Sequence, residues 1–292
     1  MTQQVMFGGN WTQQKLQILS KYLRAYRKIF DRNTRARYFR VSYVDAFAGT
    51  GTIPRPELEG TLAGLIPSLM EAEEEFRKGS VRRALEIEPP FHNYIFIEKD
   101  RGKCDELLAL REEFPDRNIV VVNDDANLAL LKWCQQMDTR SERAVVFLDP
   151  FGASVEWTVI EAIAGTKAVD LWILFPYGAV NRMLTRDRKP SPSWSDKLTR
   201  IFGTPAWEDE FYSSSLITSL LEPDKEVAFV QKTTDQTTTV NFFVKRLNTV
   251  FSEIAEPGFL CNSKGLLFVL FFAACNRTGS KIANDLLRDI AR

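Results

Sequence analysis

Short apolar runs alternate with stretches of helical periodicity between Val41 and Phe175, and this alternation constrains the fold more than any other feature of the sequence. The apolar runs cover residues 41–47, 94–97, 119–122, 144–148 and 169–175. Apolar residues recur at helical spacing over residues 100–111, 126–137 and 155–164. Apolar runs joined by helices are typical of strands buried on both faces of a parallel sheet. The sequence therefore predicts an α/β fold with a doubly wound, mostly parallel sheet.

Further elements flank this predicted core. We expect helices over residues 12–30, 61–77, 195–202, 206–221, 240–254 and 281–290, and an antiparallel hairpin from residues 258–261 and 266–274. The chain divides into a basic helical segment (1–40), a core (41–178), a helical insertion (179–255) and a closing hairpin and helix that complete the core (256–292). The stretch from Arg182 to Asp196 is predicted to be a mobile loop that acts as a lid or substrate clamp.

Acidic residues follow four successive predicted strands. They are Asp45, Glu98, the pair Asp124 and Asp125, and Asp149. Ligands of doubly wound sheets bind beyond the carboxyl ends of the strands, so these side chains are candidates for one binding site. Each also has a plainer interpretation, because Asp and Glu are favoured at helix starts and as N-caps.

A glycine turn, Phe47-Ala48-Gly49-Thr50-Gly51, follows the first predicted strand. Gly49 and Gly51 would let the backbone approach a ligand closely, although a plain tight turn has the same sequence. A dinucleotide site needs a third glycine where this chain has Pro54, and a phosphate-binding loop needs Lys followed by Ser or Thr after its last glycine. The turn therefore favours a ligand without phosphates.

The carboxylates suggest what that ligand is. Glu98 is placed to accept hydrogen bonds from ribose hydroxyls, Asp124 or Asp125 from the exocyclic amine of adenine, and Asp45 from an ammonium group. S-adenosylmethionine matches this polarity, and we predict it as the cofactor.

The tetrapeptide Asp149-Pro150-Phe151-Gly152 follows the fourth predicted strand. A carboxylate and a backbone carbonyl that accept the two hydrogens of an exocyclic amine would turn the nitrogen lone pair toward an incoming methyl group. We assign these roles to Asp149 and Pro150, and stacking on the base to Phe151. Trp157 and Tyr177 add aromatic surface near this edge. The alternative is a strand-ending turn in which Asp149 caps a helix and the rings lie in the core.

The 38 basic and 38 acidic side chains balance, but their distribution is uneven. Nine cations and one acid lie between Trp11 and Arg40. From this segment and a second basic cluster we predict the following contacts to nucleic acid: Lys21, Arg24, Arg27, Arg35, Arg37 and Arg182. Aromatic residues interleaved with the cations fit the same interpretation or plain packing.

Cysteine and histidine usage excludes other classes. The four cysteines form no CxxC pair and the single histidine, His92, has no cysteine near it, so we predict neither a metal site nor disulfides. No signal peptide or membrane-spanning run is evident, so we expect a cytoplasmic protein that does not bind membranes.

Over residues 41–178 these motifs resemble class I S-adenosylmethionine-dependent methyltransferases. The resemblance implies that Asp45 to Gly51 is the cofactor turn, Glu98 the ribose acid, Asp125 or Asp124 the adenine acid, and Asp149 to Gly152 the catalytic strand end. The tetrapeptide is similar to that of tRNA guanine dimethyltransferases. It is less similar to the Asp-Pro-Pro-aromatic motif of amino-methyltransferases, because one proline is missing.

Over nearly the whole chain the sequence resembles the bacterial three-Cys-motif partner proteins. The matching segments are Trp11 to Leu16, Tyr22-Leu23, Tyr43 to Gly51, Phe96 to Glu98, Phe147 to Gly152, Trp157, Phe268 to Asn276 and Gly279. This resemblance implies a partner protein with a three-Cys motif, and it does not identify a reaction.

The sequence thus predicts a methyltransferase that acts on an exocyclic amine of a nucleic-acid base. Two alternatives remain open. One is a non-catalytic, nucleic-acid-binding accessory protein on a methyltransferase-like fold, and the other is a methyltransferase for a peptide or small molecule.

Overall fold

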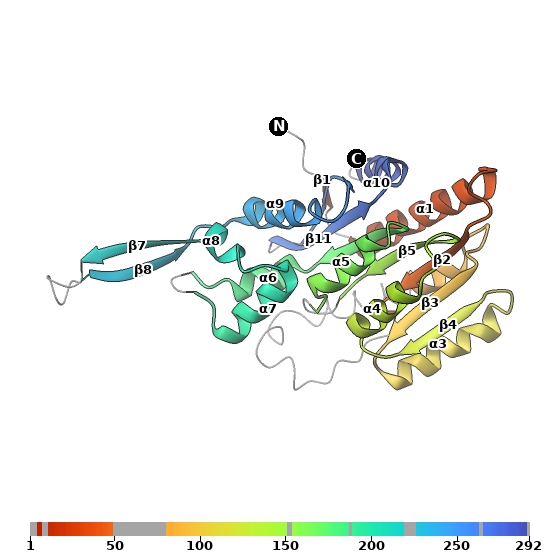
Figure 1. Cartoon of the computed structure of the whole chain (residues 1–292), viewed down its shortest axis with the longest axis horizontal. Coiled ribbons are helices and arrows are strands. Elements are labelled where there is room, and N and C mark those ends of the chain that lie inside the picture. Colours follow the sequence, from red (N-terminus) through yellow and green to blue (C-terminus); the bar gives the residue numbers. More distant parts are fainter. Residues whose placement is uncertain are drawn as a thin grey trace.

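A mixed sheet forms the centre of the molecule, with helices on both of its faces (Figure 1). The structure, a computed structural model, describes residues 5–7, 11–48, 80–150, 154–186, 189–218, 226–262 and 265–290. Within these residues the strands of the sheet are β1 (Val5–Phe7), β2 (Arg40–Asp45), β3 (Asn93–Glu98), β4 (Ile119–Asn123), β5 (Glu142–Leu148), β6 (Val169–Phe175), β9 (Glu253–Ile254), β10 (Gly258–Asn262) and β11 (Gly265–Ala274).

The strand order defines the topology. It runs β1-β10-β11-β6-β5-β2-β3-β4, and the short β9 pairs with β11. Strands β2 to β6 are mutually parallel, whereas β11 is antiparallel to both β6 and β10. The sheet is therefore mostly parallel and doubly wound, and the C-terminal hairpin completes it, as predicted from the sequence.

Helices bury a separate apolar core on each face of the sheet. One core contains Val44 and Val146 from the strands and the helices α4 (Ala126–Gln136), α5 (Trp157–Gly165), α6 (Tyr177–Met183), α7 (Pro192–Phe202), α8 (Trp207–Phe211) and α9 (Gln236–Leu247). The other contains Tyr43 and Val145, the helical residues 80–85, and the helices α1 (Trp11–Arg32), α3 (Arg101–Glu113) and α10 (Arg277–Ile290). Successive residues of a strand point to opposite faces, so apolar runs were needed to fill both cores.

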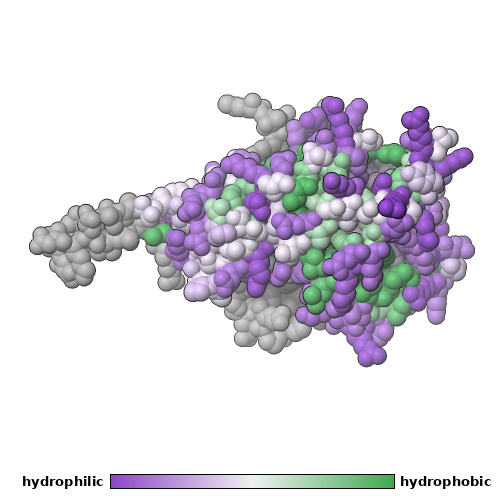
Figure 2. All heavy atoms as spheres, in the orientation of Figure 1, coloured by the Kyte–Doolittle hydropathy of each residue, from purple (hydrophilic) through white to green (hydrophobic). Residues whose placement is uncertain are grey.

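The outer strand β4 leaves apolar side chains at the surface. Val120 is 40% exposed, and Leu128 on the neighbouring α4 is 54% exposed. Figure 2 shows hydrophobic residues gathered at this end of a face that is otherwise largely hydrophilic. Within the described chain, β4 is also the last strand of the sheet, so it presents an open strand edge.

The sequence predicted the core elements well and the insertion poorly. All five predicted strands are present, as are the helices α1, α3, α4 and α5. Short β1 was not predicted, and α10 begins at Arg277, four residues before the expected start. The predicted helix over 61–77 lies outside the described residues.

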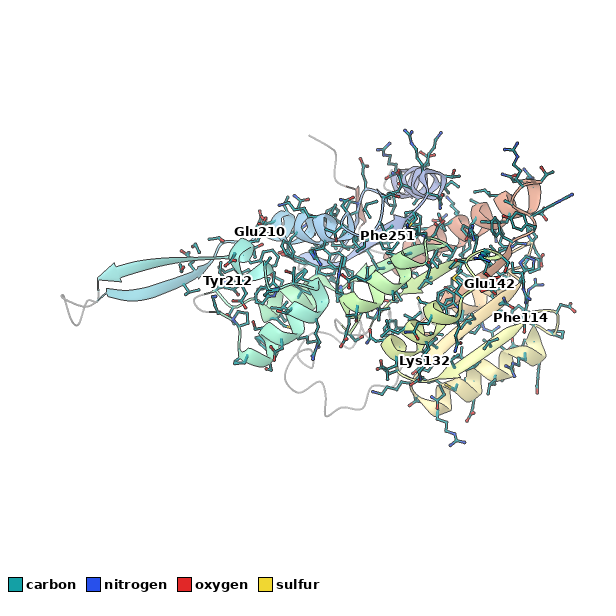
Figure 3. The ribbon with its side chains drawn as sticks, viewed as in Figure 1. Phe114, Lys132, Glu142, Glu210, Tyr212 and Phe251 are labelled. Carbon is teal, nitrogen blue, oxygen red and sulfur yellow. The ribbon has the colours of Figure 1, made fainter. Side chains whose placement is uncertain are left out.

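The prediction of one helix over 206–221 is wrong. Helix α8 ends at Phe211, and Tyr212–Thr218 forms strand β7, which pairs with β8 (Glu226–Lys232) in a two-stranded arm that extends away from the body (Figure 1). Glu210 and Tyr212 mark the base of this arm in Figure 3. Strand β8 contains the short apolar run 227–230, which the sequence analysis did not assign to a strand.

The expected loop from Arg182 to Asp196 is shorter than predicted. Helix α6 continues to Met183 and α7 begins at Pro192. Described residues between them contact the start of β7, since the Tyr212 hydroxyl donates to the Thr185 carbonyl at 3.0 Å. Its function as a lid stays a prediction.

A buried polar cluster joins α1, β6 and the start of α10. The Tyr22 hydroxyl donates to Asp170 Oδ2 at 2.6 Å, and Asn276 Nδ2 donates to Asp170 Oδ1 at 3.0 Å. The Gly279 amide donates to Asn276 Oδ1 at 2.9 Å. Burial raises the pKa of the Asp170 carboxyl to about 6, against the hydrogen bonds from Tyr22 and Asn276, which lower it.

We expect Tyr22→Phe and Gly279→Ala each to lower the free energy of unfolding by about 1–3 kcal/mol. The first removes a donor from a buried carboxylate, and the second places a Cβ 2.8 Å from Asp170 Oδ2. Urea unfolding followed by circular dichroism measures both. Tyr38→Phe is the control because Tyr38 is 65% exposed, and equal losses in all three variants would contradict this account.

Candidate functional site

The carboxyl ends of the parallel strands bring three of the predicted acids together. Asp45, the last residue of β2, pairs with Phe96 of β3 on one side and Phe147 of β5 on the other. Glu98 and Asp149 each lie two residues beyond these partners. Because neighbouring strands are about 4.8 Å apart, β3 and β5 are separated by only about 10 Å across β2.

Asp45 is buried and held by three hydrogen bonds. Its side chain is 1% exposed. Oδ1 accepts from the Phe47 amide at 3.2 Å, and Oδ2 accepts from the Tyr43 hydroxyl at 3.2 Å and the Ser80 hydroxyl at 3.0 Å. Burial raises the pKa of the Asp45 carboxyl to about 7. The three hydrogen bonds oppose that rise, and the negative charge of Asp149 adds to it.

Asp149 follows β5 and is also 1% exposed. Burial is the main cause of the raised pKa of Asp45 and of the Tyr43 hydroxyl, and the negative charge of Asp149 adds to both. A cation bound beside Asp45 would favour its ionised form. Pro150 is buried beside Asp149. The predicted residues Phe151, Gly49 and Gly51 lie outside the described part of the chain.

The segment after the tetrapeptide is fastened by Asn127, a residue that sequence reasoning missed. Asn127 on α4 donates from Nδ2 to the Ser154 carbonyl and accepts at Oδ1 from the Glu156 amide, both at 3.0 Å. Ser80 and Tyr43, which donate to Asp45, were missed as well. Asn127 and Ser80 lie far from their partners in sequence, and Tyr43 lies inside an apolar run, so no local motif marks them.

Glu98 ends β3 and is half-buried. Its Oε1 accepts from the Asp100 amide at 2.8 Å. Asp100, not Glu98, caps α3, because the Lys103 amide donates to Asp100 Oδ1 at 3.0 Å. Glu98 therefore occupies the edge position expected of a ligand-binding acid and not that of a helix cap.

Asp124 and Asp125, which follow β4, bind protein groups. Asp125 is the N-cap of α4, since its Oδ1 accepts from the amides of Asn127 at 3.0 Å and Leu128 at 3.4 Å. Asp124 Oδ2 forms an ion pair with Lys132 at 2.8 Å, and this contact lowers the pKa of the Asp124 carboxyl. The N-cap interpretation of Asp125 is thus confirmed. Lys132 is labelled in Figure 3.

Two aromatic residues predicted to face the substrate are buried. Trp157 is 2% exposed, lies edge-on to Phe243, and is covered by Arg246, whose guanidinium carbon is 4.5 Å from the ring centroid. Tyr177 is 8% exposed at the start of α6. In this structure both rings pack in the core, and a substrate-facing role for Trp157 is wrong.

The basic segment is only partly a surface feature. Arg27 is 6% exposed, and its Nε donates to the Pro90 carbonyl at 2.7 Å, so its prediction as a nucleic-acid contact is wrong. Burial lowers the pKa of its guanidinium. Lys21, Arg24, Arg35 and Arg37 are exposed.

These exposed cations extend to the edge of the sheet opposite the acids. Arg40 begins β2, at the far end of the strand from Asp45, and pairs with Glu142, which begins β5 (Figure 3). Six residues of strand span roughly 20 Å. Arg35 and Arg37 precede Arg40 and so lie toward that opposite edge.

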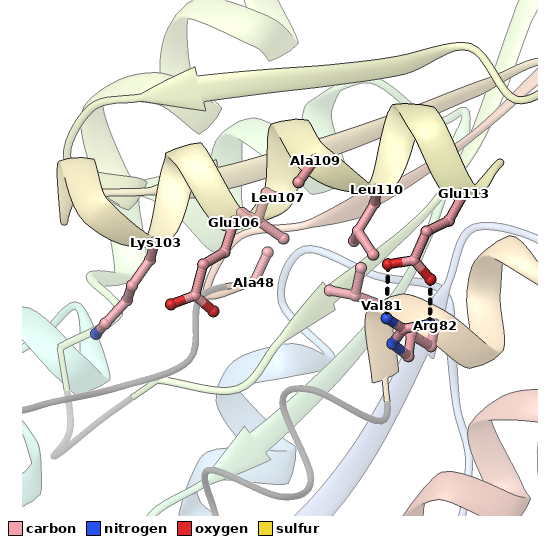
Figure 4. Close-up of a pocket in the computed structure, with 9 residues that line it drawn as sticks. All are labelled: Ala48, Val81, Arg82, Lys103, Glu106, Leu107, Ala109, Leu110 and Glu113. Atoms are coloured by element: carbon pink, nitrogen blue, oxygen red, sulfur yellow. Dashed lines mark hydrogen bonds and ion pairs between the residues drawn. The ribbon is translucent and has the colours of Figure 1, made fainter. Parts of the chain in front are cut away.

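A cavity of about 300 Å³ lies between α3 and residues 81–82 (Figure 4). Its apolar wall is formed by Ala48, Val81, Leu107 and Leu110. The charged groups at its rim include Arg82 and Glu113, which make two hydrogen bonds of 2.7 and 2.9 Å. None of the strand-end acids lines it. We place the candidate site at those acids because, within the described residues, the buried carboxylates Asp45 and Asp149 lie there at the ends of adjacent strands.

The topology now defines the class of the fold. Its order, with the reversed β11 inserted beside β6, is that of class I S-adenosylmethionine-dependent methyltransferases. The fold is therefore methyltransferase-like, and Asp45, Glu98 and Asp149 lie at its ligand-binding edge.

Comparisons with known proteins found distant likenesses to solved structures. No family model and no curated protein sequence matches the chain. An S-adenosylmethionine-dependent methyltransferase from Clostridium acetobutylicum is 8% identical with a TM-score of 0.38, and the match covers 89% of this chain and 92% of that one. At such identities and scores the likeness carries no argument about function.

Two further structures are comparably distant. The N-terminal domain of EvdMO1, crystallised with bound SAH, is 12% identical with a TM-score of 0.36, and the match covers 88% of this chain and 81% of that one. A Legionella pneumophila protein is 13% identical with a TM-score of 0.36, and the match covers 80% of this chain and 91% of that one.

The described residues contain neither a membrane-spanning helix nor a cluster of potential metal ligands. No helix among them is both long enough and apolar enough to cross a membrane. Among the same residues, no group of three or more His, Cys, Asp or Glu side chains is arranged to hold a metal ion.

The raised pKa values of Asp45 and Asp170 predict a pH-dependent stability. Between pH about 4 and about 7 the folded protein binds more protons at these carboxyls than the unfolded chain does, so the free energy of unfolding falls as pH rises through this window. Urea unfolding at several pH values should show this fall, and Asp45→Asn should reduce it. The exposed-site variant Asp196→Asn should leave it unchanged, and an unchanged fall in Asp45→Asn would contradict the assignment.

Proposed function

We propose that the protein is an S-adenosylmethionine-dependent methyltransferase whose acceptor is an exocyclic amine of a nucleic-acid base. The observation that carries the proposal is the pair of buried carboxylates, Asp45 and Asp149, at the ends of adjacent parallel strands in a fold of methyltransferase topology. The raised pKa of Asp45 supports a cationic ligand there, because a positive charge would stabilise the carboxylate form.

The residues present fit the cofactor. Asp45 would hold its ammonium group directly or through water, and Glu98, half-buried at the end of β3, would accept hydrogen bonds from its ribose. For its adenine, Asp124 or Asp125 is the candidate; helix amides engage Oδ1 of Asp125, whereas the Asp125 amide and Lys132 engage the two oxygens of Asp124. When bound, S-adenosylmethionine supplies an electrophilic methyl group.

The catalytic residues would be those that directly follow β5. Asp149 would accept a hydrogen bond from one N–H of the base's amine, and the Pro150 carbonyl would accept a hydrogen bond from the other N–H. Together they would direct the nitrogen lone pair toward the methyl carbon. Burial of Asp149 excludes water, which strengthens this electrostatic positioning.

A nucleic-acid substrate is supported by the exposed cations Lys21, Arg24, Arg35 and Arg37. Tyr38, 65% exposed beside Phe39 at a centroid distance of 4.1 Å, adds a ring on which a base could stack. These groups lie toward the edge opposite Asp149. That separation favours a second candidate function, a nucleic-acid-binding accessory protein that works with a three-Cys-motif partner and transfers no methyl group.

Cofactor binding is tested by thermal unfolding. S-adenosylhomocysteine should raise the melting temperature of the parent protein, and Asp45→Asn or Glu98→Ala should abolish the rise. Because Asp45 ionises near pH 7, the rise should be larger at pH 8 than at pH 6. Lys103→Gln, in the cavity of Figure 4, should keep it. If Lys103→Gln abolished the rise while Asp45→Asn and Glu98→Ala kept it, the ligand would be assigned to that cavity instead.

Catalysis is tested by transfer of a labelled methyl group to RNA, DNA and protein. We expect transfer to nucleic acid, and a loss of about 10²–10³-fold in Asp149→Ala, because that variant removes a positioned acceptor. Asp196→Asn serves as the matched control. Full activity in Asp149→Ala would reject its role. Cofactor binding without transfer to any acceptor would favour the accessory function.

A further inference from the structure

Two cations lie side by side where the arm joins the body. Lys232 is the last residue of β8, and its backbone amide donates to the Arg186 carbonyl at 2.8 Å. The Lys232 ammonium donates to Asn181 Oδ1 at 2.6 Å and to the Leu184 carbonyl at 3.5 Å. These neutral acceptors orient the ammonium group without neutralising it.

The charges of this pair are not compensated by acids in the described chain. Lys232 is half-buried and Arg186 is exposed, and no ion pair among the described residues joins either to a carboxylate. Burial and the charge of Arg186 both lower the pKa of Lys232. Neighbouring lysines differ, since Lys189 pairs with Glu208 at 2.8 Å and Lys245 with Glu210 at 3.2 Å. An anion would relieve the repulsion between Arg186 and Lys232.

The pair is close to the candidate catalytic edge. Strand β6 lies next to β5, which leads into Asp149, and α6 begins two residues after β6 ends. A seven-residue helix spans roughly 10 Å, so Asn181 and Lys232, which donates to it, lie about one short helix from that edge. From there the arm extends away from the body (Figure 1).

We propose that Arg186 and Lys232 bind backbone phosphates of the nucleic acid whose base reaches Asp149. This inference rests on the proposed methyltransferase function. Phosphate contacts fix the register of a nucleic acid without reading its sequence, and two adjacent cations beside a catalytic edge suit that task. The substrate would thus be gripped at the base of the arm, near the acids, whereas the cations of residues 35–37 lie toward the opposite edge.

The test measures binding of labelled single-stranded and duplex RNA and DNA by fluorescence anisotropy, at salt concentrations between about 50 and 200 mM. The test variant is Arg186→Gln with Lys232→Gln, in which glutamine keeps a donor for Asn181. Loss of two phosphate contacts should weaken binding. It should also reduce the slope of log affinity against log salt by about 1.4 for single strands and about 1.8 for duplexes. Lys245→Gln, which removes an acid-paired cation nearby, should leave the slope unchanged.

Three outcomes are decisive. An unchanged slope in the double variant overturns the proposal. The proposal is also overturned if the double variant loses binding to a polyglutamate peptide as strongly as it loses binding to nucleic acid, because that would indicate a site for acidic protein. The thermal shift with S-adenosylhomocysteine should be the same in the double variant and the parent. If the parent shows no such shift while the slope still falls, the methyltransferase function fails and the phosphate site stands.

Discussion

The register of β2 between β3 and β5 is the constraint on which the candidate site depends. Parallel pairing aligns Asp45 with Phe96 and Phe147, and so brings Glu98 and Asp149 to the same edge on either side of it. A shift of one residue would turn Asp45 to the other face of the sheet, away from Ser80, which donates to its carboxylate. The apolar cores on both faces hold this register, so the stability of the fold and the geometry of the site have one origin.

Burial gives these carboxylates their chemical character. In water Asp45 would be fully ionised at neutral pH, but here burial and the charge of Asp149 keep it close to the midpoint of its titration. Such a group responds strongly to a bound cation. Asp170 is buried too, but Tyr22 and Asn276 donate to it at the opposite end of β6, where it joins three elements. Position in the sheet, more than residue type, separates the candidate binding acid from the structural one.

Much of the site could be predicted because strand ends are visible in the sequence as places where apolar runs stop. Asp45, Glu98 and Asp149 were found in this way. The predictions for Arg27 and Trp157 were wrong, because the type of a basic or aromatic residue does not show whether it lies on the exposed or the buried face of its helix. Asn127 could not have been predicted to fasten residues 154–156, since its partners are brought to it only by the packing of α4 against α5. The arm was missed because the helical period expected before it does not continue past Phe211.

By itself, the sequence determined the class of the fold and the residues at the strand ends, since periodicity and the ends of apolar runs are local properties. Only the tertiary structure decided which cations are exposed, which aromatic rings are core, and which carboxylates influence one another. It also decided that Lys232 meets Arg186, 46 positions earlier in the chain. Burial and electrostatic coupling depend on distances between residues remote in sequence, and those distances are set when the two apolar cores close over the sheet.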